Sequence, residues 1–400
     1  MIAMAARLRS QGMPFPAPPR QAESPWSRSL ASADPTANTG PIVIAAGGTA
    51  GHVFPAAALA AVLRSRGLRP VVLTDARAAK QDFAGAERHV IPGAGIAGRG
   101  PFRAFTALGA IISGTFTAWH LLMNLHPAAV VGFGGYPSVA PALAARLLRR
   151  RPVVLLHEQN AVLGRANRVL ARIADAVAVS FPSTRHAPAG AVLTGNPVRA
   201  AVAALAHRGY SPAIPEEPAR LVVLGGSLGA RAFSDLVPAA LARSPDLDRL
   251  ELTQQCRHED LARVEAAYAA IGIDHAEVAA FFSDMPARMA AADLVIARAG
   301  ASTVAELAAI GRPSIFLPLP GAIDDHQRAN AQALAAVGAA LVLDERGLTP
   351  ERLEAEITSL LDDRPRLSAM AAAAKCLGRP NAAEALADLV TALIARRSGT

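Results

Sequence analysis

The sequence predicts an α/β protein made of two doubly wound, Rossmann-like domains that face one another across a cleft. Its 400 residues are enough for two such domains, and strand-like apolar runs alternate with helix-like stretches throughout. Each half also contains one glycine-rich strand-to-helix turn, at residues 47–51 and 225–229. Glycines allow a close backbone approach, and the N–H groups at the next helix start attract anions. The paired turns therefore predict a phosphate-binding site.

Composition narrows the class of protein and its partners. Apolar residues make up 52 % of the chain but aromatic residues only 4 %, so alanine, leucine and valine must fill the interior. The net charge of +8 favours acidic lipid surfaces, nucleic acid or phosphorylated substrates, without choosing among them. Only Cys256 and Cys376 are present, which excludes a disulfide framework or thiolate metal cluster and favours a cytoplasmic location.

The chain divides by composition. Residues 1–40, rich in proline, serine and arginine, are expected to form a disordered extension, or to follow a start codon assigned too early, and they lack the apolar stretch of a signal peptide. We expect an N-terminal domain over residues 41–207, a proline-rich linker over 208–219 and a C-terminal domain over 220–380. The expected strands cover residues 41–46, 70–74, 128–132, 152–157, 175–179 and 191–194, then 220–224, 249–253, 276–280, 293–297, 313–317 and 339–343.

Residues 105–125 carry no Asp, Glu, Lys or Arg and are long enough to cross a bilayer. Polar residues interrupt this segment and a strand pattern follows at once, so we expect a covered helix of a doubly wound domain instead. Apolar residues recur here at steps of three or four behind two arginines, which fits either a core-facing helix or a face that docks on a membrane leaflet. The residues of this pattern are Arg99, Phe102, Arg103, Phe105, Leu108, Ile112, Phe116 and Trp119.

Ligands of doubly wound sheets bind at the carboxyl ends of the strands. A third glycine-rich turn, residues 132–138, has the pattern of a packing turn. The polar run 157–160 (HEQN) directly follows an apolar strand, which favours a site over a solvated loop because unpaired burial is costly. Arg199 follows another strand and suits either a diphosphate or a surface salt bridge.

Residues 293–306 give the strongest local pattern. A strand ends at Arg298, Gly300 forms the turn, and the following helix start can face a diphosphate. Glu306 lies one turn later, where it can accept hydrogen bonds from ribose hydroxyls or simply complement the helix dipole. Further on, Asp324 and Asp325 are an unconvincing metal site without other acidic residues, and Gln327 fits a sugar-hydroxyl contact.

Taken in order, these motifs resemble the MurG family of UDP-N-acetylglucosamine transferases, which act on the lipid-linked muramyl pentapeptide (lipid I) of peptidoglycan synthesis. The resemblance covers residues 41–395 and includes GGTAGHVFPA, GFGGYPS, HEQN, GNPVR, GGSLGAR, FFSDM, RAGASTVAE and DDHQRANA. It implies a GT-B fold whose C-terminal helix, about residues 381–396, crosses back to an acceptor-binding and membrane-binding first domain. It also implies an inverting transfer without metal or cofactor.

The resemblance assigns residues to both substrates. His52 and Tyr136 match positions on the acceptor side, and His52 is the candidate general base, or else a phosphate contact. The positions implied for the UDP-sugar are Thr49, Ala50, Gly51, Asn160, Arg199, Ser227, Phe282, Ala301, Ser302, Thr303, Val304, Ala305, Glu306 and Gln327.

The implied partners are UDP-N-acetylglucosamine, lipid I and the anionic cytoplasmic leaflet of the inner membrane, with no nucleic acid. A polyprenyl acceptor favours the docking interpretation for Arg99, Phe102, Arg103, Phe105, Phe116 and Trp119. Two alternatives remain at this point: a soluble UDP-N-acetylglucosamine 2-epimerase of the same fold, and a non-catalytic membrane module that binds nucleotide sugar.

Overall fold

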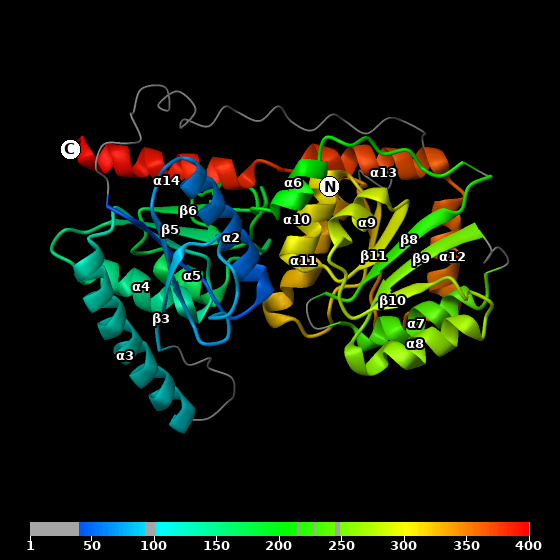
Figure 1. The fold of residues 1–400 in the computed structure, drawn as a ribbon, viewed down its shortest axis with the longest axis horizontal. Coiled ribbons are helices and arrows are strands. Elements are labelled where there is room, and N and C mark those ends of the chain that lie inside the picture. The colour runs from blue at the N-terminus through cyan, green and yellow to red at the C-terminus, as the bar shows by residue number, and fades with distance from the viewer. Residues whose placement is uncertain (1–39, 93–100, 215, 227–228, 245–248, 400) are drawn as a thin grey trace. The chain divides into compact units, whose positions relative to one another are not determined.

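The computed structural model describes residues 40–92, 101–214, 216–226, 229–244 and 249–399, and within residues 101–108 it describes the backbone only. Nearly all of the expected N-terminal extension therefore lies outside the described residues. The described chain contains two parallel β-sheets with helices packed on them (Figure 1).

The first sheet has seven parallel strands in the order β3-β2-β1-β4-β5-β6-β7. Its inner strands are apolar runs that are buried along their length, as expected for a parallel sheet covered on both faces. The strands are β1 (Ile42–Ala45), β2 (Pro70–Thr74), β3 (Glu87–Val90), β4 (Ala129–Gly132), β5 (Val153–Glu158), β6 (Ala176–Val179) and β7 (Val192–Leu193).

The second sheet repeats this arrangement with six parallel strands in the order β10-β9-β8-β11-β12-β13. The strands are β8 (Ala219–Leu224), β9 (Leu250–Gln255), β10 (Glu277–Ala279), β11 (Leu294–Ala297), β12 (Ser314–Phe316) and β13 (Ala340–Val342). The predicted fold class, two doubly wound α/β domains, is confirmed.

Every strand range expected from an apolar run overlaps an observed strand, and β3 is the strand that the sequence analysis missed. This strand, Glu-Arg-His-Val, lies at the edge of the sheet and is largely exposed. It therefore has no apolar run from which a strand could be predicted. The pairing of β3 with β2 comes from backbone hydrogen bonds rather than from side-chain burial.

Helices connect the strands in both halves. The first half contains α2 (Ala50–Ser65), α3 (Pro101–Leu125), α4 (Tyr136–Leu147), α5 (Arg165–Leu170) and α6 (Ala200–Leu205). The second half contains α7 (Arg231–Leu241), η2 (His258–Asp260), α8 (Leu261–Ala269), α9 (Met285–Ala291), α10 (Ala301–Ile310), η3 (Ile323–Asp325), α11 (His326–Ala335), α12 (Pro350–Leu361), α13 (Arg364–Leu377) and α14 (Ala382–Ser398).

Two helices cross between the halves. The last helix, α14, packs against α2, β4 and β5 of the first half. Figure 1 shows it in red, beside the elements of the first half. Conversely, α6 packs against α9 and α10 of the second half. One apolar cluster accordingly contains Phe181 and Val198 from the first half with Met289 and Val304 from the second.

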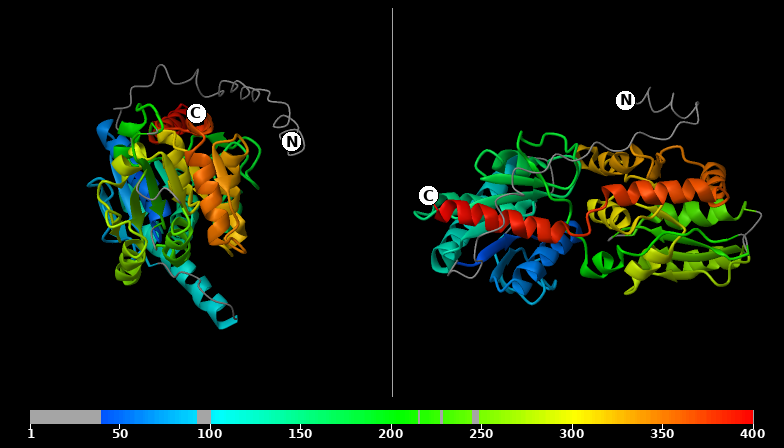
Figure 2. Two further views of the ribbon diagram at one scale, coloured as in Figure 1. Left: turned by 90° about the vertical axis from the view of Figure 1, so that its right-hand side faces the viewer. Right: turned by 90° about the horizontal axis from the view of Figure 1, so that it is seen from above.

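Helix α3 lies along α4 and has two different faces. Ala118 and Leu122 are buried against the first domain, whereas Ile112 and Phe116 are 62 % and 61 % exposed. Figure 2 shows the cyan helix α3 extending away from the sheets. None of the described helices combines the length and the apolar character that a membrane-spanning segment needs.

Candidate functional site

The order of the strands identifies where ligands should bind. In the first sheet the order reverses between β1 and β4, and in the second between β8 and β11. Ligands of doubly wound sheets lie beyond the carboxyl ends of the strands at such reversals. The glycine-rich turns after β1, β4 and β8, and the Gly300 turn after β11, all follow strands at these two positions, although they are far apart in the sequence.

The turn after β1 is held by a carboxylate from β2's end. Gly48 N donates to Asp75 Oδ1 (3.2 Å), and the other oxygen of Asp75 accepts two hydrogen bonds from Arg77 (2.9 and 2.7 Å). Burial acts to raise the pKa of Asp75, but Arg77 and the backbone donors outweigh it and hold the pKa below its ordinary value. The turn leads through Thr49 into Ala50 and Gly51 at the start of α2, where no side chain caps the helix.

His52 lies on the first turn of α2, next to the third glycine-rich turn. Thr49 Oγ1 is 3.3 Å from His52 Nδ1. A β-carbon placed on Gly134 would come within 3.7 Å of Nε2, and one on Gly135 within 3.6 Å of Cε1. Burial lowers the pKa of His52, although the carboxylate of Glu158 opposes that shift. The imidazole is therefore neutral near pH 7 and able to accept a proton.

The HEQN run (residues 157–160) begins with the last two residues of β5 and contains three structural side chains and one candidate ligand contact, Asn160. His157 is fully buried, and its Nε2–H donates to the carbonyl of Gly195 (2.9 Å) while its Nδ1 accepts from Gln159 Nε2 (2.9 Å). Burial lowers the pKa of His157 to about 4, so this ring is neutral in the folded protein. Asn160, only half-buried, is the member of the run that remains within reach of a ligand.

Glu158 organises the loop that carries Asn160. Its Oε1 accepts hydrogen bonds from Asn160 N (3.0 Å) and Asn160 Nδ2 (3.1 Å). Its Oε2 accepts from Gly164 N (2.8 Å) and Asn167 Nδ2 (2.9 Å). The expectation of a polar site after β5 thus fits Asn160, whereas the other three side chains support the loop.

Arg199 and Glu306, predicted separately to contact diphosphate and ribose, lie against each other. Arg199 Nε donates to Glu306 Oε1 (2.7 Å) and Nη2 donates to Oε2 (2.8 Å). This pair raises the pKa of Arg199 despite its burial. The guanidinium also lies 5.7 Å from the ring centre of Phe54 on α2. The pair thereby joins the segment before α6 to α10 and α2.

The start of α10 follows Gly300, which adopts an extended conformation as the N-cap residue. No side chain caps this helix start. Ser302 Oγ is buried and has no hydrogen-bond partner among the described residues. A buried hydroxyl without a partner is costly unless a ligand completes it, so this helix start fits an anion. The other predicted residues here, Ala301, Thr303, Val304 and Ala305, form its first turns.

Gln327 lies on the first turn of α11. Its Oε1 accepts a hydrogen bond from Leu319 N (2.9 Å), which fixes the oxygen toward the loop after β12 and leaves the amide nitrogen for a ligand. The two residues before α11, Asp324 and Asp325, both have positive φ angles (53° and 52°). Such a conformation is strained for residues other than glycine, and strain of this kind often lies near functional sites.

Asp324 is held by three arginines of the first half. Its Oδ1 accepts from Arg165 Nη2 (3.2 Å) and its Oδ2 from Arg168 Nη2 (3.1 Å). Its backbone carbonyl accepts from Arg185 Nη2 (3.4 Å). Hydrogen bonding by Arg165 lowers the pKa of Asp324. This cluster could not be predicted from the sequence, because nothing in the local sequence indicates that these residues meet.

The remaining predicted residues lie on α4, after β10, on α3 or outside the described residues. Tyr136 is half-buried at the start of α4, and burial raises the pKa of its hydroxyl. Phe282 follows β10, with the guanidinium of Arg288 4.6 Å above its ring. Trp119 is half-buried on α3, and the centre of its ring is 6.0 Å from the centre of the Phe116 ring. Ser227 and Arg99 lie outside the described residues, as do the side chains of Phe102, Arg103 and Phe105.

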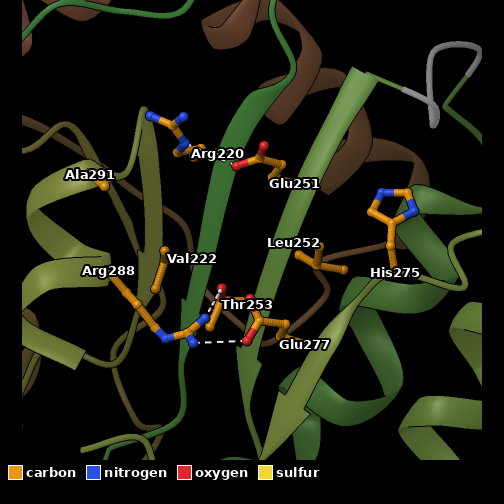
Figure 3. A pocket seen from close by; sticks show the side chains of 9 residues that line it. All are labelled: Arg220, Val222, Glu251, Leu252, Thr253, His275, Glu277, Arg288 and Ala291. Atoms are coloured by element: carbon orange, nitrogen blue, oxygen red, sulfur yellow. Dashed lines mark hydrogen bonds and ion pairs between the residues drawn. The ribbon is translucent and has the colours of Figure 1, made fainter. Parts of the chain in front are cut away.

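A pocket of about 240 Å³ lies elsewhere, on the face of the second sheet between β8, β9, β10 and α9 (Figure 3). Its charged side chains are paired, Arg220 with Glu251 (2.9 Å) and Arg288 with Glu277 (2.8 Å). Arg220, Glu251 and Glu277 belong to the first residues of their strands. The pocket is therefore at the opposite strand ends from the candidate site, and none of the predicted residues lines it.

Two family models match this chain. The glycosyltransferase family 28 N-terminal domain matches residues 42–179, and the glycosyltransferase family 28 C-terminal domain matches residues 220–386. Each match contains one of the two sheets, apart from β7 and the first residue of β8. The gap between the matches spans α6 and the segment that joins the halves.

Relatives align over nearly their whole lengths. A protein of Acidiphilium cryptum is 55 % identical over 364 residues, which are 89 % of this chain and 98 % of the relative. A protein of Granulibacter bethesdensis is 54 % identical over 88 % of this chain and 93 % of its own. Both are named UDP-N-acetylglucosamine--N-acetylmuramyl-(pentapeptide) pyrophosphoryl-undecaprenol N-acetylglucosamine transferase.

Among the solved structures, some resemble this chain in both sequence and fold, and others in fold alone. The crystal structure of Acinetobacter baumannii MurG is 34 % identical, with a TM-score of 0.71, and the match covers 88 % of this chain and 99 % of that one. A proposed UDP-N-acetylglucosamine 2-epimerase of Listeria monocytogenes has a TM-score of 0.62 over 86 % of this chain and 94 % of its own, but only 15 % identity. The second likeness shows the shared fold alone.

Proposed function

The chain belongs to the MurG family within glycosyltransferase family 28, and on that premise we propose that it transfers N-acetylglucosamine from UDP-N-acetylglucosamine to the muramyl 4-hydroxyl of lipid I. The product is lipid II, a precursor of peptidoglycan. The observation that carries this proposal is the identity of 55 % to a transferase of this name, over 98 % of that relative's length.

The candidate site supplies groups suited to each step. The muramyl oxygen attacks the anomeric carbon of N-acetylglucosamine. The bond between that carbon and the UDP oxygen breaks, and the configuration at the carbon inverts. His52 takes the hydroxyl proton on Nε2, since Nδ1 faces Thr49. The negative charge that develops on UDP is stabilised by the start of α10, by Arg199 and by Ser227, which resembles the fixed donors of an oxyanion site.

In this proposal polar side chains contact the ribose and the N-acetylglucosamine of UDP-N-acetylglucosamine. Glu306 accepts hydrogen bonds from the ribose hydroxyls, Gln327 and Asn160 contact the transferred sugar or the diphosphate, and the backbone of Phe282 meets the uracil. Thr49, Ala50 and Gly51, in the turn after β1, approach the nucleotide sugar, and Tyr136 lies on the acceptor side. These assignments rest on the family resemblance, and the position of the four turns at the strand-order reversals supports them.

The lipid acceptor requires the protein to work at a membrane surface, and we place it on the cytoplasmic face of the inner membrane as a peripheral protein. The exposed side chains of Ile112 and Phe116 on α3 support this proposal, because such side chains can insert among lipid acyl chains. Arg99 and Arg103 would then lie near the phosphates of anionic lipids, with Phe102 and Phe105 inserted beside them.

A transfer assay tests the function. The full chain is incubated with UDP-[¹⁴C]N-acetylglucosamine and a lipid I analogue in anionic vesicles, with and without EDTA. We expect the label to enter a lipid-extractable disaccharide product at equal rates in both arms. Release of a C2 epimer from UDP-N-acetylglucosamine alone would identify an epimerase instead. Binding of the nucleotide sugar with neither reaction would identify a non-catalytic module.

A further inference from the structure

Asn330 on α11 joins two loops of the candidate site. Its side chain is fully buried. Oδ1 accepts a hydrogen bond from Ala161 N (2.7 Å), and Nδ2 donates to the carbonyl of Ala299 (3.0 Å) and to Asn160 Oδ1 (3.1 Å). Asn160 and Ala161 follow β5 in the first sheet, whereas Ala299 follows β11 in the second. One amide therefore connects the two halves where both predicted ligand loops begin.

The orientation of this amide is fixed by its neighbours. A backbone N–H can only donate, so the oxygen of Asn330 must face Ala161, and a backbone carbonyl can only accept, so the nitrogen must face Ala299. The same nitrogen then requires an acceptor at Asn160, which places Asn160 Oδ1 toward Asn330. Oxygen and nitrogen of an amide are otherwise hard to tell apart, but here the network assigns them.

The other end of the chain of hydrogen bonds agrees with this assignment. Glu158 Oε1 accepts from Asn160 Nδ2, and Glu158 Oε2 is engaged by Gly164 N and Asn167 Nδ2. The other hydrogen bonds to this carboxylate come from N–H donors, so Glu158 also requires nitrogen, not oxygen, from Asn160. The hydrogen bonds therefore all run the same way: Ala161 donates to Asn330, Asn330 donates to Asn160, and Asn160 donates to Glu158.

We infer that Asn330 is a positioning residue for the nucleotide sugar, because it fixes the Asn160 amide so that its second N–H is the group offered to an acceptor oxygen of the ligand. An amide nitrogen carries two hydrogens, and Glu158 takes only one of them. This inference rests on the proposed function, since it assumes that Asn160 contacts the UDP-sugar.

The contact between the halves becomes part of recognition in this arrangement. Asn160 belongs to the first half, but the residue that sets its orientation belongs to α11 of the second. If α11 moved away, Glu158 alone would hold the Asn160 amide, and its second N–H would be less firmly directed at the ligand.

Substitution of Asn330 by aspartate tests the inference, with binding of UDP-N-acetylglucosamine measured by calorimetry from about pH 6 to about pH 8.5. An ionised Asp can accept from Ala161 but cannot donate to Asn160 or to the carbonyl of Ala299. We expect the Kd to rise about tenfold at the alkaline end, the effect of losing the one hydrogen bond between Asn160 and the ligand. A protonated carboxyl regains a donor, and burial raises its pKa. The Kd should therefore return toward that of the unsubstituted protein as the pH falls.

Gln332→Glu is the matched control, because Gln332 lies on the same helix and is exposed. Its Kd should follow that of the unsubstituted protein at every pH. Asn160→Ala provides a second control: if Asn330 acts through Asn160, adding Asn330→Asp to this variant should cause no further loss of affinity. A purely structural role for Asn330 predicts additive losses instead.

A folded Asn330→Asp variant with unchanged affinity at alkaline pH would overturn the inference. If that variant does not fold, Asn330→Ser replaces it in the same comparison. A serine hydroxyl is too short to reach both neighbours, so the loss of affinity should persist without its pH dependence, and unchanged affinity would again contradict the inference. The transfer assay separates the two proposals, since an unsubstituted protein that binds the nucleotide sugar but transfers nothing would contradict the proposed function alone.

Discussion

Arg199 and Glu306 form a two-pronged ion pair, with N···O distances of 2.7 and 2.8 Å, although 107 residues separate them in the chain. The carboxylate of Glu306 is nearly buried, whereas about a third of the Arg199 side chain is exposed. The pair engages Nε and Nη2 of Arg199 and does not involve Nη1. One contact thus orders both residues that were expected to meet different parts of the UDP-sugar.

Replacing Arg199 by alanine should reduce both stability and donor binding. The change leaves the Glu306 carboxylate buried without its partner, so we expect the free energy of unfolding to fall by about 2 kcal/mol, less than for a fully buried pair because Arg199 is partly exposed. Urea denaturation and the KM for UDP-N-acetylglucosamine check this. Arg220→Ala, which breaks the exposed pair with Glu251, is the control and should change neither. An Arg199→Ala variant that matches this control would argue against the role of the pair.

His52 should act as a base whose activity appears at unusually low pH. Since burial lowers its pKa, the ring loses its proton below the ordinary value, and the rate should fall only when the pH drops below that lowered pKa. We expect His52→Ala to reduce kcat by about 10²-fold or more, the usual contribution of a general base. The exposed His207 supplies the control substitution. Near-normal turnover by His52→Ala would remove the assignment.

His157 should make the protein less stable in mild acid. Its folded-state pKa is about 4, against an ordinary value near 6.5, so the unfolded chain binds a proton that the folded protein excludes between these values. Stability is therefore fully present above about pH 6.5 and should decline by about 1.4 kcal/mol per pH unit as the pH falls toward 4. His157→Gln should show a shallower decline in denaturation curves over this range. Parallel curves for the two proteins would refute this cause.

Asp324 should influence activity without touching the reacting atoms. Asp324→Asn removes the charge that Arg165 and Arg168 bind, and we expect kcat/KM to fall about tenfold because the loop that leads to Gln327 loses its anchor. Asp325→Asn is the matched control. The ion pair of Asp325 with Arg328 lies at the surface and is worth less than about 1 kcal/mol. Equal kinetics for both variants would indicate that the arginine cluster does not position the loop.

The exposed face of α3 should carry membrane binding. Flotation with anionic vesicles is expected to recover the unsubstituted chain in the lipid fraction and to lose the variant with Ile112→Ser and Phe116→Ser. Both side chains are largely exposed, so the substitutions should leave the melting temperature nearly unchanged. Ile214→Ser changes an exposed apolar residue outside α3 and serves as the control. Undiminished flotation of the α3 variant would contradict the docking proposal.

Much of the fold could be predicted because its signals are local. Apolar runs such as Val153–Glu158 mark strands that are buried on both faces, and glycine-rich turns mark where the chain enters the next helix. The edge strand Glu87–Val90 escaped prediction because it is stabilised mainly by backbone pairing and has exposed side chains. The predicted ligand residues also followed from local motifs, and their individual roles stay predictions.

The sequence by itself determined the two parallel sheets, the turns at their strand ends and the family, since each depends on residues near one another in the chain. Only the tertiary structure decided which polar groups meet: Arg199 with Glu306, Asp324 with arginines of the first half, and Asn330 with the loop after β5. The reason is that a buried polar side chain must find partners wherever the packing of the strands and helices places them. No local sequence pattern indicates which of these residues, far apart in the chain, will meet.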